Sequence, residues 1–511
     1  MTFQSIIYQN TDDGVKLESV DMPDFFVDLN LDQVIDKITA QKNEYNLKPF
    51  FYSPLHNLDA IHFRQEIMRD LEDDFLLGVL NGFAAQMVLV RRYLNMISKL
   101  YFKYHQEGWH LEAAAEYCEA ISTLSDNLSG IQLNSKGFLE FREYITAYNR
   151  SEEFLSLASE ISSIKADLAS IQYEIIIKDT LVKVRKYEGE IDYSTEVEKT
   201  FEKFKQGEVK NYKVKMINYS GMNHIEAQIL NCVVRLHPEI FTKLNLFYTK
   251  RKQFMDEKIQ EFDREIQFYI SYIEFISNIK GKGLDFCMPM VTPTKNEIYA
   301  NQAFDVALAD KRQFEKTSIV CNDFQLEGPE RVIVVSGPNQ GGKTTFARMF
   351  GQLHFFASLG LPVPGNKAQL FLFDNIFTHF EKEEDIRNLR GKLKDDLVRI
   401  HNILDRASSE SIIIMNEIFT STALEDAIFL SKQIMDRIIL LDCLGVCVSF
   451  IDELSTINQK IVSMVSSIVP NNPALRTFKI TRKPADGLSY AICIAEKHRL
   501  TYDSIKERIA L

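Results

Sequence analysis

Gly337-Pro-Asn-Gln-Gly-Gly-Lys-Thr344 follows the apolar run Val332 to Val335, and a stretch with helical period begins at Thr344. The octapeptide fits the pattern GxxxxGK[ST], in which a strand delivers a tight loop to the N-terminus of a helix. The backbone N–H groups of such a loop and the helix dipole converge on phosphate groups. The stretch therefore predicts a phosphate-binding loop set in an α/β fold.

Each position of this loop has an expected role. Gly337, Gly341 and Gly342 let the backbone approach the phosphates. Lys343 contacts the β- and γ-oxygens, and the Thr344 hydroxyl ligates Mg²⁺. A nucleoside triphosphate and Mg²⁺ are thus the expected ligands, although the loop alone leaves kinase, GTPase and ATPase open.

A second polar group follows the apolar strand Ser411 to Met415, where Asn416 and Glu417 come next in the chain. A P-loop fold places its metal-organising and water-activating groups at this end of a strand beside the loop. Glu417 is therefore the expected general base for an attacking water. Asn416 stands where an aspartate is usual and is a metal-site candidate without charge, so weaker Mg²⁺ binding or slower turnover is expected. A plain strand end turning into a loop is the alternative.

The chain beyond about residue 290 alternates apolar strands with helices, which predicts a mainly parallel sheet covered on both faces. The expected strands and helices are Arg331 to Ser336, a helix from Thr344, Leu370 to Thr378, a helix through Leu389 to Ala407, Ser411 to Met415, a helix from Ala423 to Leu441, and Gly445 to Ile451.

The chain before residue 290 has mainly helical period instead. No glycine or proline interrupts the stretch between Pro238 and Gly281, so one helix of about 40 residues and roughly 60 Å is expected. Helical runs are also expected over Gln86 to His105, His110 to Asn127 and Phe138 to Ala166. A small β element is expected where Ile171 to Lys178, Leu181 to Tyr187 and Tyr212 to Ile217 are β-rich.

Composition limits the partners. The net charge of −12 argues against a protein that coats nucleic acid, so any such contact must be local. The segment from Lys178 to Lys215 is the candidate; a solvated surface hairpin and helix is the alternative. Its lysines include Lys203, Lys205, Lys210 and Lys213.

Three further features point to a cytoplasmic protein. No apolar run approaches the ~18 residues that span a bilayer, and Met1 to Gly14 does not resemble a signal peptide. The seven cysteines lack CxxC spacing, so neither disulfides nor a zinc site is suggested. Cys447 is read as a buried strand cysteine and not as a metal ligand paired with Cys443.

The loop is narrower than a general P-loop. Gly337 to Thr345 matches Gly-Pro-Asn-x-Gly-Gly-Lys-[Ser/Thr]-Thr and resembles the nucleotide-binding loop of the MutS mismatch-repair ATPases. Val363-Pro364, Asp374 to Thr378, Ser411 to Glu417 and Asp486 to Ala495 resemble later segments of the same family, in the expected order. Upstream, Ile319 to Asn322 resembles the family's adenine-side segment, although it lacks the aromatic often found there.

The resemblance implies a multidomain fold. Residues 1–290 would form an all-α core and lever domain with a small β-containing, clamp-like insertion near 171–217. Residues 291–511 would form an α/β P-loop NTPase domain of ABC type with a C-terminal helical dimerisation segment. The resemblance implies that ATP contacts Pro338, Asn339, Gln340, Thr345, Ile319 and Asn322 as well as the residues above.

Departures from the family pattern concern the readout of the nucleotide. Phe450 stands where a nucleotide-sensing histidine is usual, and Gly391 stands where a serine would reach the partner's γ-phosphate. Phe419-Thr-Ser-Thr422 replaces Gly-Arg-Gly-Thr. The core-like pattern begins near Asp28, so no mismatch-reading domain is expected before it.

The resemblance implies a homodimeric ATPase that couples nucleotide state to DNA binding in repair or recombination, with repair proteins as further partners and no membrane. Two alternatives stay open. One is a ribosome- or RNA-directed relative, although the C-terminal nuclease-like module usual in that branch is not seen before Leu511. The other is an ATP-gated scaffold with weak hydrolysis, which Asn416 and Phe450 suggest.

Overall fold

The computed structural model describes residues 3–9, 20–179, 181–189, 196–197, 199–200, 221–312, 318–381, 391–420, 422–469, 472–485, 500–502 and 505–506. Contacts divide the chain into two compact units. The first unit is Met1–Phe3, Asp74–Gln132 and Glu140–Asp263, and the second is Gln4–Asp73, Leu133–Leu139 and Arg264–Leu511. The domain boundary expected near residue 290 was placed where the sequence pattern changes, whereas these units are defined by contacts between residues. That boundary stays a prediction.

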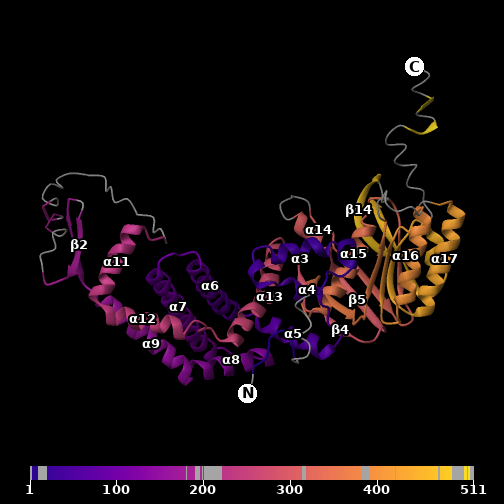
Figure 1. Ribbon diagram of the computed structural model, residues 1–511. Helices are drawn as coiled ribbons and strands as arrows, with labels where there is room; N and C mark the ends of the chain where they lie inside the picture. The colour runs from indigo at the N-terminus through magenta and orange to yellow at the C-terminus, as the bar shows by residue number, and fades with distance from the viewer. Residues whose placement is uncertain are drawn as a thin grey trace. The chain divides into compact units, whose positions relative to one another are not determined.

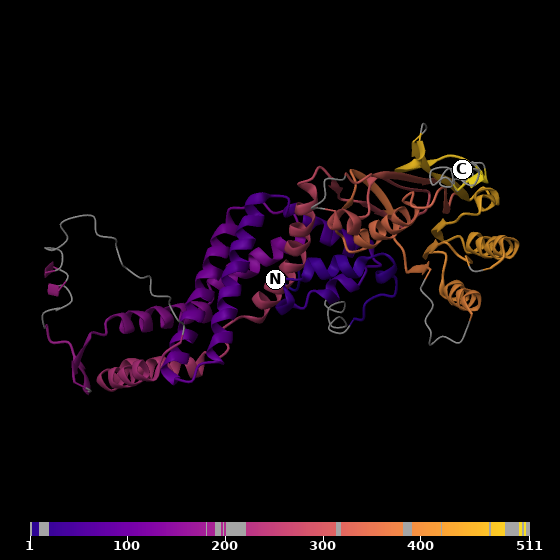
Figure 2. The same ribbon diagram turned by 90° about the horizontal axis from the view of Figure 1, so that it is seen from above.

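The first unit is built mainly from helices (Figure 1). They are α6 (Asp74–Ile97), α7 (Lys103–Ser129), α8 (Lys136–Asn149), α9 (Glu152–Ala169), α11 (His224–Leu236), α12 (Pro238–Lys250) and the start of α13 (Glu257–Lys280). Helix α7 packs against α6, α9 and α12, and α6 and α7 run side by side in both Figure 1 and Figure 2. Aromatic side chains fill the core, where Phe141 stacks on Phe262 and Phe83 packs beside it.

Three of the expected helical runs are each divided in two, which corrects the sequence interpretation. The run from 86 to 105 covers the end of α6 and the start of α7. The stretch from 238 to 280 forms α12 and α13, and the Asp256 carboxylate caps the second helix by accepting from Ile259 N at 3.0 Å. The stretch from 138 to 166 forms α8 and α9, and the Ser151 hydroxyl accepts from Phe154 N at 3.2 Å. Capping side chains start a new helix because they satisfy N–H groups that have no partner within the helix.

Helix α6 corrects a second expectation. Among the described residues it is long and apolar enough by composition to cross a membrane, with a mean hydropathy of 1.3 over the window tested. One third of that window is buried (33%). A core helix of a soluble protein passes the same test, so α6 alone is weak evidence for a membrane.

The expected β element is present in part. Strands β1 (Tyr173–Lys178) and β2 (Leu181–Lys186) pair antiparallel with Lys178 opposite Leu181, and Asp179 in the turn has φ of 54°. Strand β2 contacts α11. The expected strand from Tyr212 to Ile217 lies outside the described residues.

A six-stranded sheet organises the second unit, in the order β10-β11-β12-β7-β13-β14. All its strands run parallel except β14, which is antiparallel to β13. The strands are β10 (Ile376–Phe380), β11 (Ile412–Asn416), β12 (Leu444–Val448), β7 (Val332–Ser336), β13 (Ile461–Val469) and β14 (Asn472–Arg482). The parallel sheet confirms the α/β expectation for this part of the chain.

Helices cover both faces of this sheet. Helix α15 (Lys343–Ser358) packs on β11 and β12, where Gly351 lies against Ile414. Ile413 and Met415 point to the other face and form an apolar cluster with α16 (Lys392–Arg406) and α17 (Leu424–Leu441). Opposite faces are used because successive strand side chains point in opposite directions. Cys447 in β12 is fully buried, as expected for a strand cysteine.

A smaller sheet and several short elements complete the second unit. The sheet has the order β4-β9-β5-β6, and β3 pairs with β8. The elements are α2 (Phe25–Asp28), α3 (Leu31–Thr39), η1 (Asn43–Tyr45), α4 (Lys48–Tyr52), α5 (Leu58–Asp70), β3 (Phe286–Cys287), β4 (Met290–Thr292), β5 (Glu297–Ala303), α14 (Val306–Lys311), β6 (Asn322–Glu327), β8 (Val363–Pro364), β9 (Lys367–Phe371) and η2 (Asp452–Thr456). The single strand expected over 370–378 is in fact the end of β9 and the start of β10, which belong to different sheets.

Candidate functional site

The loop from Gly337 to Gly342 joins β7 to α15, which confirms the expected context of strand, loop and helix. Gly342 precedes the helix with φ of 90°, a conformation that residues with a side chain rarely adopt. Helix α15 therefore begins at Lys343 with its N-terminal N–H groups directed toward the loop, as phosphate binding requires.

Ser466 of β13 contacts the loop and holds its backbone in place by a hydrogen bond. Its fully buried hydroxyl donates to the Gly341 carbonyl oxygen at 2.7 Å. A Cβ on Gly341 would lie 2.3 Å from the Ser466 Oγ. This close approach explains why a glycine is needed at position 341.

The Lys343 side chain is nearly buried, with 4% of it exposed. Its ammonium group donates to the carbonyl oxygens of Gly337 and Pro338 at 3.0 and 3.2 Å and to the Asn339 Oδ1 at 3.4 Å. Burial lowers the pKa of Lys343, and the Glu417 carboxylate, 3.7 Å from the ammonium, opposes that shift. The loop thus holds one buried cation whose charge partner in the structure is Glu417, and a phosphate group would add a second anionic partner.

Strand β11 carries the two polar residues that sequence reasoning placed beside the loop. The Thr344 hydroxyl donates to the Asn416 Oδ1 at 2.9 Å. Glu417 comes next, with φ of 54°, and its backbone N–H donates to the Val448 carbonyl oxygen at 2.9 Å. Its side chain is 32% exposed, so the carboxylate is accessible to water.

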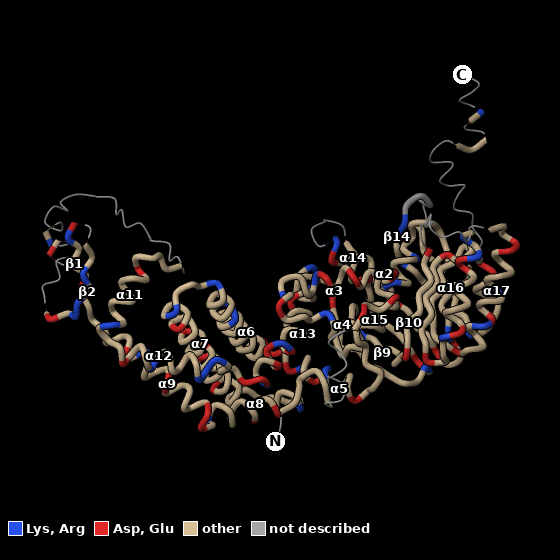
Figure 3. The backbone as a smooth tube through the Cα atoms, in the orientation of Figure 1, with Lys and Arg blue, Asp and Glu red and all other residues tan. Residues whose placement is uncertain are grey.

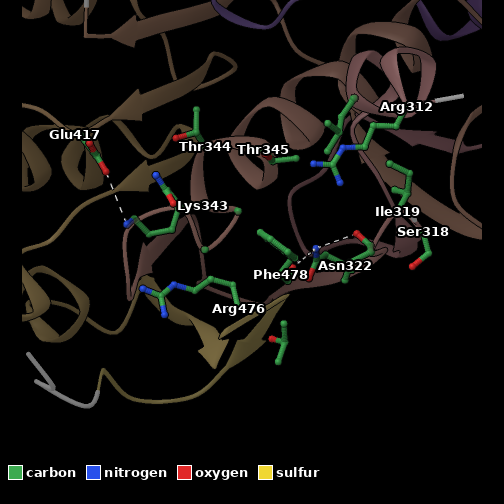
Figure 4. Close-up of a pocket in the computed structure, with 16 residues that line it drawn as sticks. Arg312, Ser318, Ile319, Asn322, Lys343, Thr344, Thr345, Glu417, Arg476 and Phe478 are labelled. Atoms are coloured by element: carbon green, nitrogen blue, oxygen red, sulfur yellow. Dashed lines mark hydrogen bonds and ion pairs between the residues drawn. The ribbon is translucent and has the colours of Figure 1, made fainter. Parts of the chain in front are cut away.

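A cavity of about 710 Å³ lies between the loop and two other segments (Figure 4). Lys343, Thr344 and Glu417 line one end. Arg312, Ser318 and Ile319 lie at the other end, as Figure 4 shows. The cavity is also lined by five other residues that were expected to contact the nucleotide: Gln340, Gly341, Gly342, Thr345 and Asn322. Four expected residues are not in the lining: Gly337, Pro338 and Asn339 at the start of the loop, and Asn416, which accepts from the Thr344 hydroxyl.

Asn322 fastens β14 to the cavity wall. Its amide nitrogen donates to the Phe478 carbonyl oxygen at 3.2 Å, and its Oδ1 accepts from Ile480 N at 2.7 Å. Phe478 has φ of 58° and is 43% exposed at the cavity. Asn322 therefore positions the aromatic ring of Phe478 in the cavity wall. The segment Ile319 to Asn322 itself contains no aromatic residue.

Arg476, Phe478 and Arg312 line the cavity and were missed from the sequence. Arg476 and Phe478 lie in β14 on either side of Thr477, which also lines the cavity. Regular strand alternation does not place them, because Phe478 has φ of 58° and the pairing of β13 with β14 contains register shifts. Local sequence carried no signal for them, since β14 returns alongside the loop only through its pairing with β13.

Gly391 and Phe450, the two positions where residues that sense the nucleotide are expected, are not among the described residues that line this cavity. Gly391 is the N-cap residue of α16, and a Cβ added there meets no atom within 4 Å. Phe450 follows β12 and is 47% exposed. The candidate nucleic-acid lysines Lys203, Lys205, Lys210 and Lys213, and the segment Asp486 to Ala495, lie outside the described residues.

Comparison with known proteins agrees with this geometry. Residues 333–507 match the family described as MutS domain V, and this range contains the loop, β11 and β14. This part of the chain is therefore similar to domain V of the MutS family. The DNA mismatch repair protein MutS of Thermotoga maritima is 26% identical over 182 residues, which are 35% of this chain and 23% of that protein. MutS of Psychrobacter cryohalolentis is 28% identical over 171 residues, which are 33% of this chain and 16% of that protein.

One relative is similar to this chain well beyond the region that matches MutS domain V. The DNA mismatch repair protein MSH3 of Debaryomyces hansenii is 22% identical over 437 residues, which are 81% of this chain and 40% of that protein. The chain thus spans less than half the length of these curated relatives.

Proposed function

We propose that this protein binds and hydrolyses ATP and couples its nucleotide state to DNA binding. The observation that carries the proposal is the cavity where the buried ammonium of Lys343, the N-terminus of α15 and the carboxylate of Glu417 meet. The relatives named above are DNA mismatch repair proteins, which supports DNA as the second ligand.

The residues present fit Mg²⁺. Among the described residues no group of three or more His, Cys, Asp and Glu side chains could hold a metal ion. Mg²⁺ in nucleotide sites, however, takes few protein ligands and fills its octahedron with waters and phosphate oxygens. Thr344 would supply a ligand oxygen, and Asn416 would orient it by accepting a hydrogen bond from its hydroxyl. When bound, Mg²⁺ neutralises charge that develops on the phosphates.

Glu417 and Lys343 divide the chemical work. The Glu417 carboxylate accepts a proton from water, whose oxygen attacks the γ-phosphorus. The bond from that phosphorus to the β–γ bridging oxygen breaks, and its electrons leave with ADP. Lys343 holds the β- and γ-oxygens by charge. The attraction between its ammonium and these oxygens is strong because the ammonium is buried, where little water screens the charges.

Lys343→Ala tests the binding step. We expect ATP binding, followed by fluorescence of a labelled nucleotide, to weaken by at least ~100-fold and hydrolysis to be abolished, because the loop loses its cation. Lys432→Ala on α17 is the matched control and should bind as the wild type does. Wild-type protein that takes up no ATP in the presence of magnesium would refute the proposal.

The hairpin β1–β2 is the described element best suited to a polyanion. It carries Lys178, Lys183, Arg185 and Lys186 against Glu174, which pairs with Arg185, and Asp179 in the turn (Figure 3). Its side chains are almost all exposed. Gel-shift assays over duplex DNA, branched DNA, single strands and RNA, with and without ATP, would test this. Binding confined to RNA or ribosomes would replace DNA as the ligand.

An ATP-gated scaffold is the second candidate, and the neutral Asn416 beside Thr344 favours it. The two readings differ in the effect of Glu417→Gln. An ATPase loses at least ~100-fold in turnover and keeps its ATP affinity, since the glutamine cannot accept the proton. A scaffold shows the same low turnover with either residue.

A further inference from the structure

Arg476 of β14 lies at the phosphate end of the cavity. Its Nε–H donates to the Asn339 carbonyl oxygen at 3.2 Å, and its side chain lines the cavity with Lys343 and Glu417. Figure 4 shows the guanidinium extending toward the end occupied by those two residues, away from Arg312 and Ile319. A cation from a separate strand is therefore held directly against the loop that would wrap the phosphates.

The position in the loop indicates which phosphate is concerned. Asn339 is the third residue of the loop, and its side-chain oxygen lies 3.4 Å from the Lys343 ammonium, the group that reaches the β- and γ-oxygens. Burial is the main reason that the pKa of Lys343 is lowered, and the positive charge of Arg476 adds a smaller effect in the same direction. Arg476 and Lys343 both contact Asn339 and both line the cavity, so a triphosphate's terminal group would lie within reach of both cations.

We propose that Arg476 binds the γ-phosphoryl group in cis and stabilises the charge that develops there during hydrolysis. This inference rests on the proposed function and goes beyond it by assigning a catalytic residue from β14. The planar guanidinium matches phosphate oxygens in pairs, which an ammonium does not. No proton moves to or from Arg476: Glu417 takes the proton of water, and the bridging-bond electrons leave with ADP.

The attachment of Arg476 to the loop makes the role specific for the triphosphate. Its Nε contact fixes the guanidinium relative to Asn339, and therefore relative to Lys343. ADP lacks the group that Arg476 would contact. The side chain should therefore distinguish ATP from ADP, besides accelerating the reaction.

Arg476→Ala and Arg476→Lys test this against Arg482→Ala. Arg482 lies in the same strand and pairs with Glu330, and it is not among the cavity-lining residues. Binding of ADP and of the non-hydrolysable β,γ-imido analogue of ATP would be measured by calorimetry, and turnover by phosphate release. Thermal unfolding followed by circular dichroism shows whether each variant is folded.

We expect Arg476→Ala to weaken the ATP analogue about tenfold relative to ADP and to lower turnover at least ~100-fold, as loss of an arginine finger does. Arg476→Lys should give intermediate values and Arg482→Ala wild-type values. Equal weakening of both nucleotides by Arg476→Ala, or values for Arg476→Ala that match those of Arg482→Ala, would overturn the assignment and leave the proposed ATPase intact. Wild-type protein that binds neither nucleotide would overturn both.

Discussion

The Asn416 amide oxygen accepts a hydrogen bond from the Thr344 hydroxyl at 2.9 Å, at a position where the sequence pattern leads us to expect an aspartate. The amide oxygen accepts from the hydroxyl as a carboxylate would, so the geometry is retained and only the charge is missing. The strength of Mg²⁺ binding should therefore respond to charge alone at this position.

Asn416→Asp should lower the magnesium concentration for half-maximal ATP hydrolysis about tenfold, within the range found for residues that orient metal ligands. The aspartate adds charge beside Thr344 with nearly unchanged shape. Titration of hydrolysis with magnesium chloride at saturating ATP measures the effect. Asn416→Ser, which has no charge, is the control; an unchanged magnesium requirement in the aspartate variant would contradict the role of Asn416.

At the scale of single residues, sequence was informative where chemistry and spacing are fixed together. Lys343, Thr344 and Glu417 were predicted because the loop pattern and the end of an apolar strand determine where they lie. Arg476 and Phe478 were not, because β14 reaches the loop through a long-range pairing with β13 that contains register shifts. Local pattern does not report such a pairing.

Helix α15 combines the phosphate-binding N-terminus with an ionisable group inside the core. His354 is fully buried, and its Nδ1 lies 2.8 Å from the Phe350 carbonyl oxygen. Burial lowers the pKa of His354 from 6.5 to about 4, against the smaller opposing effect of that hydrogen bond. The folded protein therefore holds this imidazole neutral at a pH where the unfolded chain protonates it.

Stability should consequently fall as the pH falls from 6.5 toward 4, because the unfolded state binds more protons in that window. At pH 5 the loss from His354 is about 2 kcal/mol relative to pH 7.5. Urea unfolding of wild type and His354→Leu at both pH values isolates this contribution, since other groups titrate in both proteins. The leucine variant should lose less stability on acidification; equal losses would contradict a buried neutral histidine.

The ends of two helices are set by capping side chains, which the spacing of hydrophobic residues does not reveal. The helical runs expected over 238–280 and 138–166 include Asp256 and Ser151, so each residue was expected to lie inside a single helix. In the structure each side chain accepts a backbone N–H and begins a new helix. Both residues are common N-caps, so the signal was present but outweighed by the absence of glycine and proline.

Charge is distributed unevenly over the whole molecule. The net charge is −12, whereas the exposed hairpin β1–β2 is rich in lysine and arginine. Lys183→Ala with Lys186→Ala should weaken DNA binding and reduce the slope of log K against log salt by about one per lysine. Gel shifts at several salt concentrations measure this. Lys165→Ala, on a helix of the same unit and paired with Glu112, is the control and should leave the slope unchanged; an unchanged slope in the hairpin variant would exclude the hairpin as the contact.

Compact units proved harder to predict than their secondary structure. Residues 4–73 belong with residues 264–511. The contacts responsible include Arg348 Nε donating to the Asp28 carbonyl oxygen at 2.8 Å and the Thr378 hydroxyl donating to the Asp28 carboxylate at 2.7 Å. Pairs more than 300 residues apart leave no trace in local period. Similar helical patterns in residues 20–70 and 74–170 gave no reason to separate them.

Dimerisation, which the family resemblance implies, is a prediction about the whole molecule, and it can be tested at Gly391. The family resemblance places a serine here, reaching the γ-phosphate bound by the partner. Gly391 has extended backbone with φ of −61° and ψ of 149°, and an added Cβ meets open space. Gly391→Ser is therefore compatible with the fold and supplies the missing hydroxyl.

If ATP is shared between two copies, this hydroxyl should tighten the dimer only when ATP is bound, because affinity for nucleotide and for partner are reciprocally linked. One hydrogen bond to a charged group is worth about 1.5–3 kcal/mol, so the dissociation constant of the ATP-bound dimer should fall at least ~10-fold. Sedimentation velocity in the Glu417→Gln background, which prevents turnover, would measure it with ATP and with ADP. Gly391→Ala is the control for the hydroxyl. Alanine adds the Cβ and removes the flexibility of glycine at the N-cap, as serine does, but it has no hydroxyl. Equal tightening with ADP, or with alanine, would show that the change acts on helix α16 itself and not on a phosphate held by the partner.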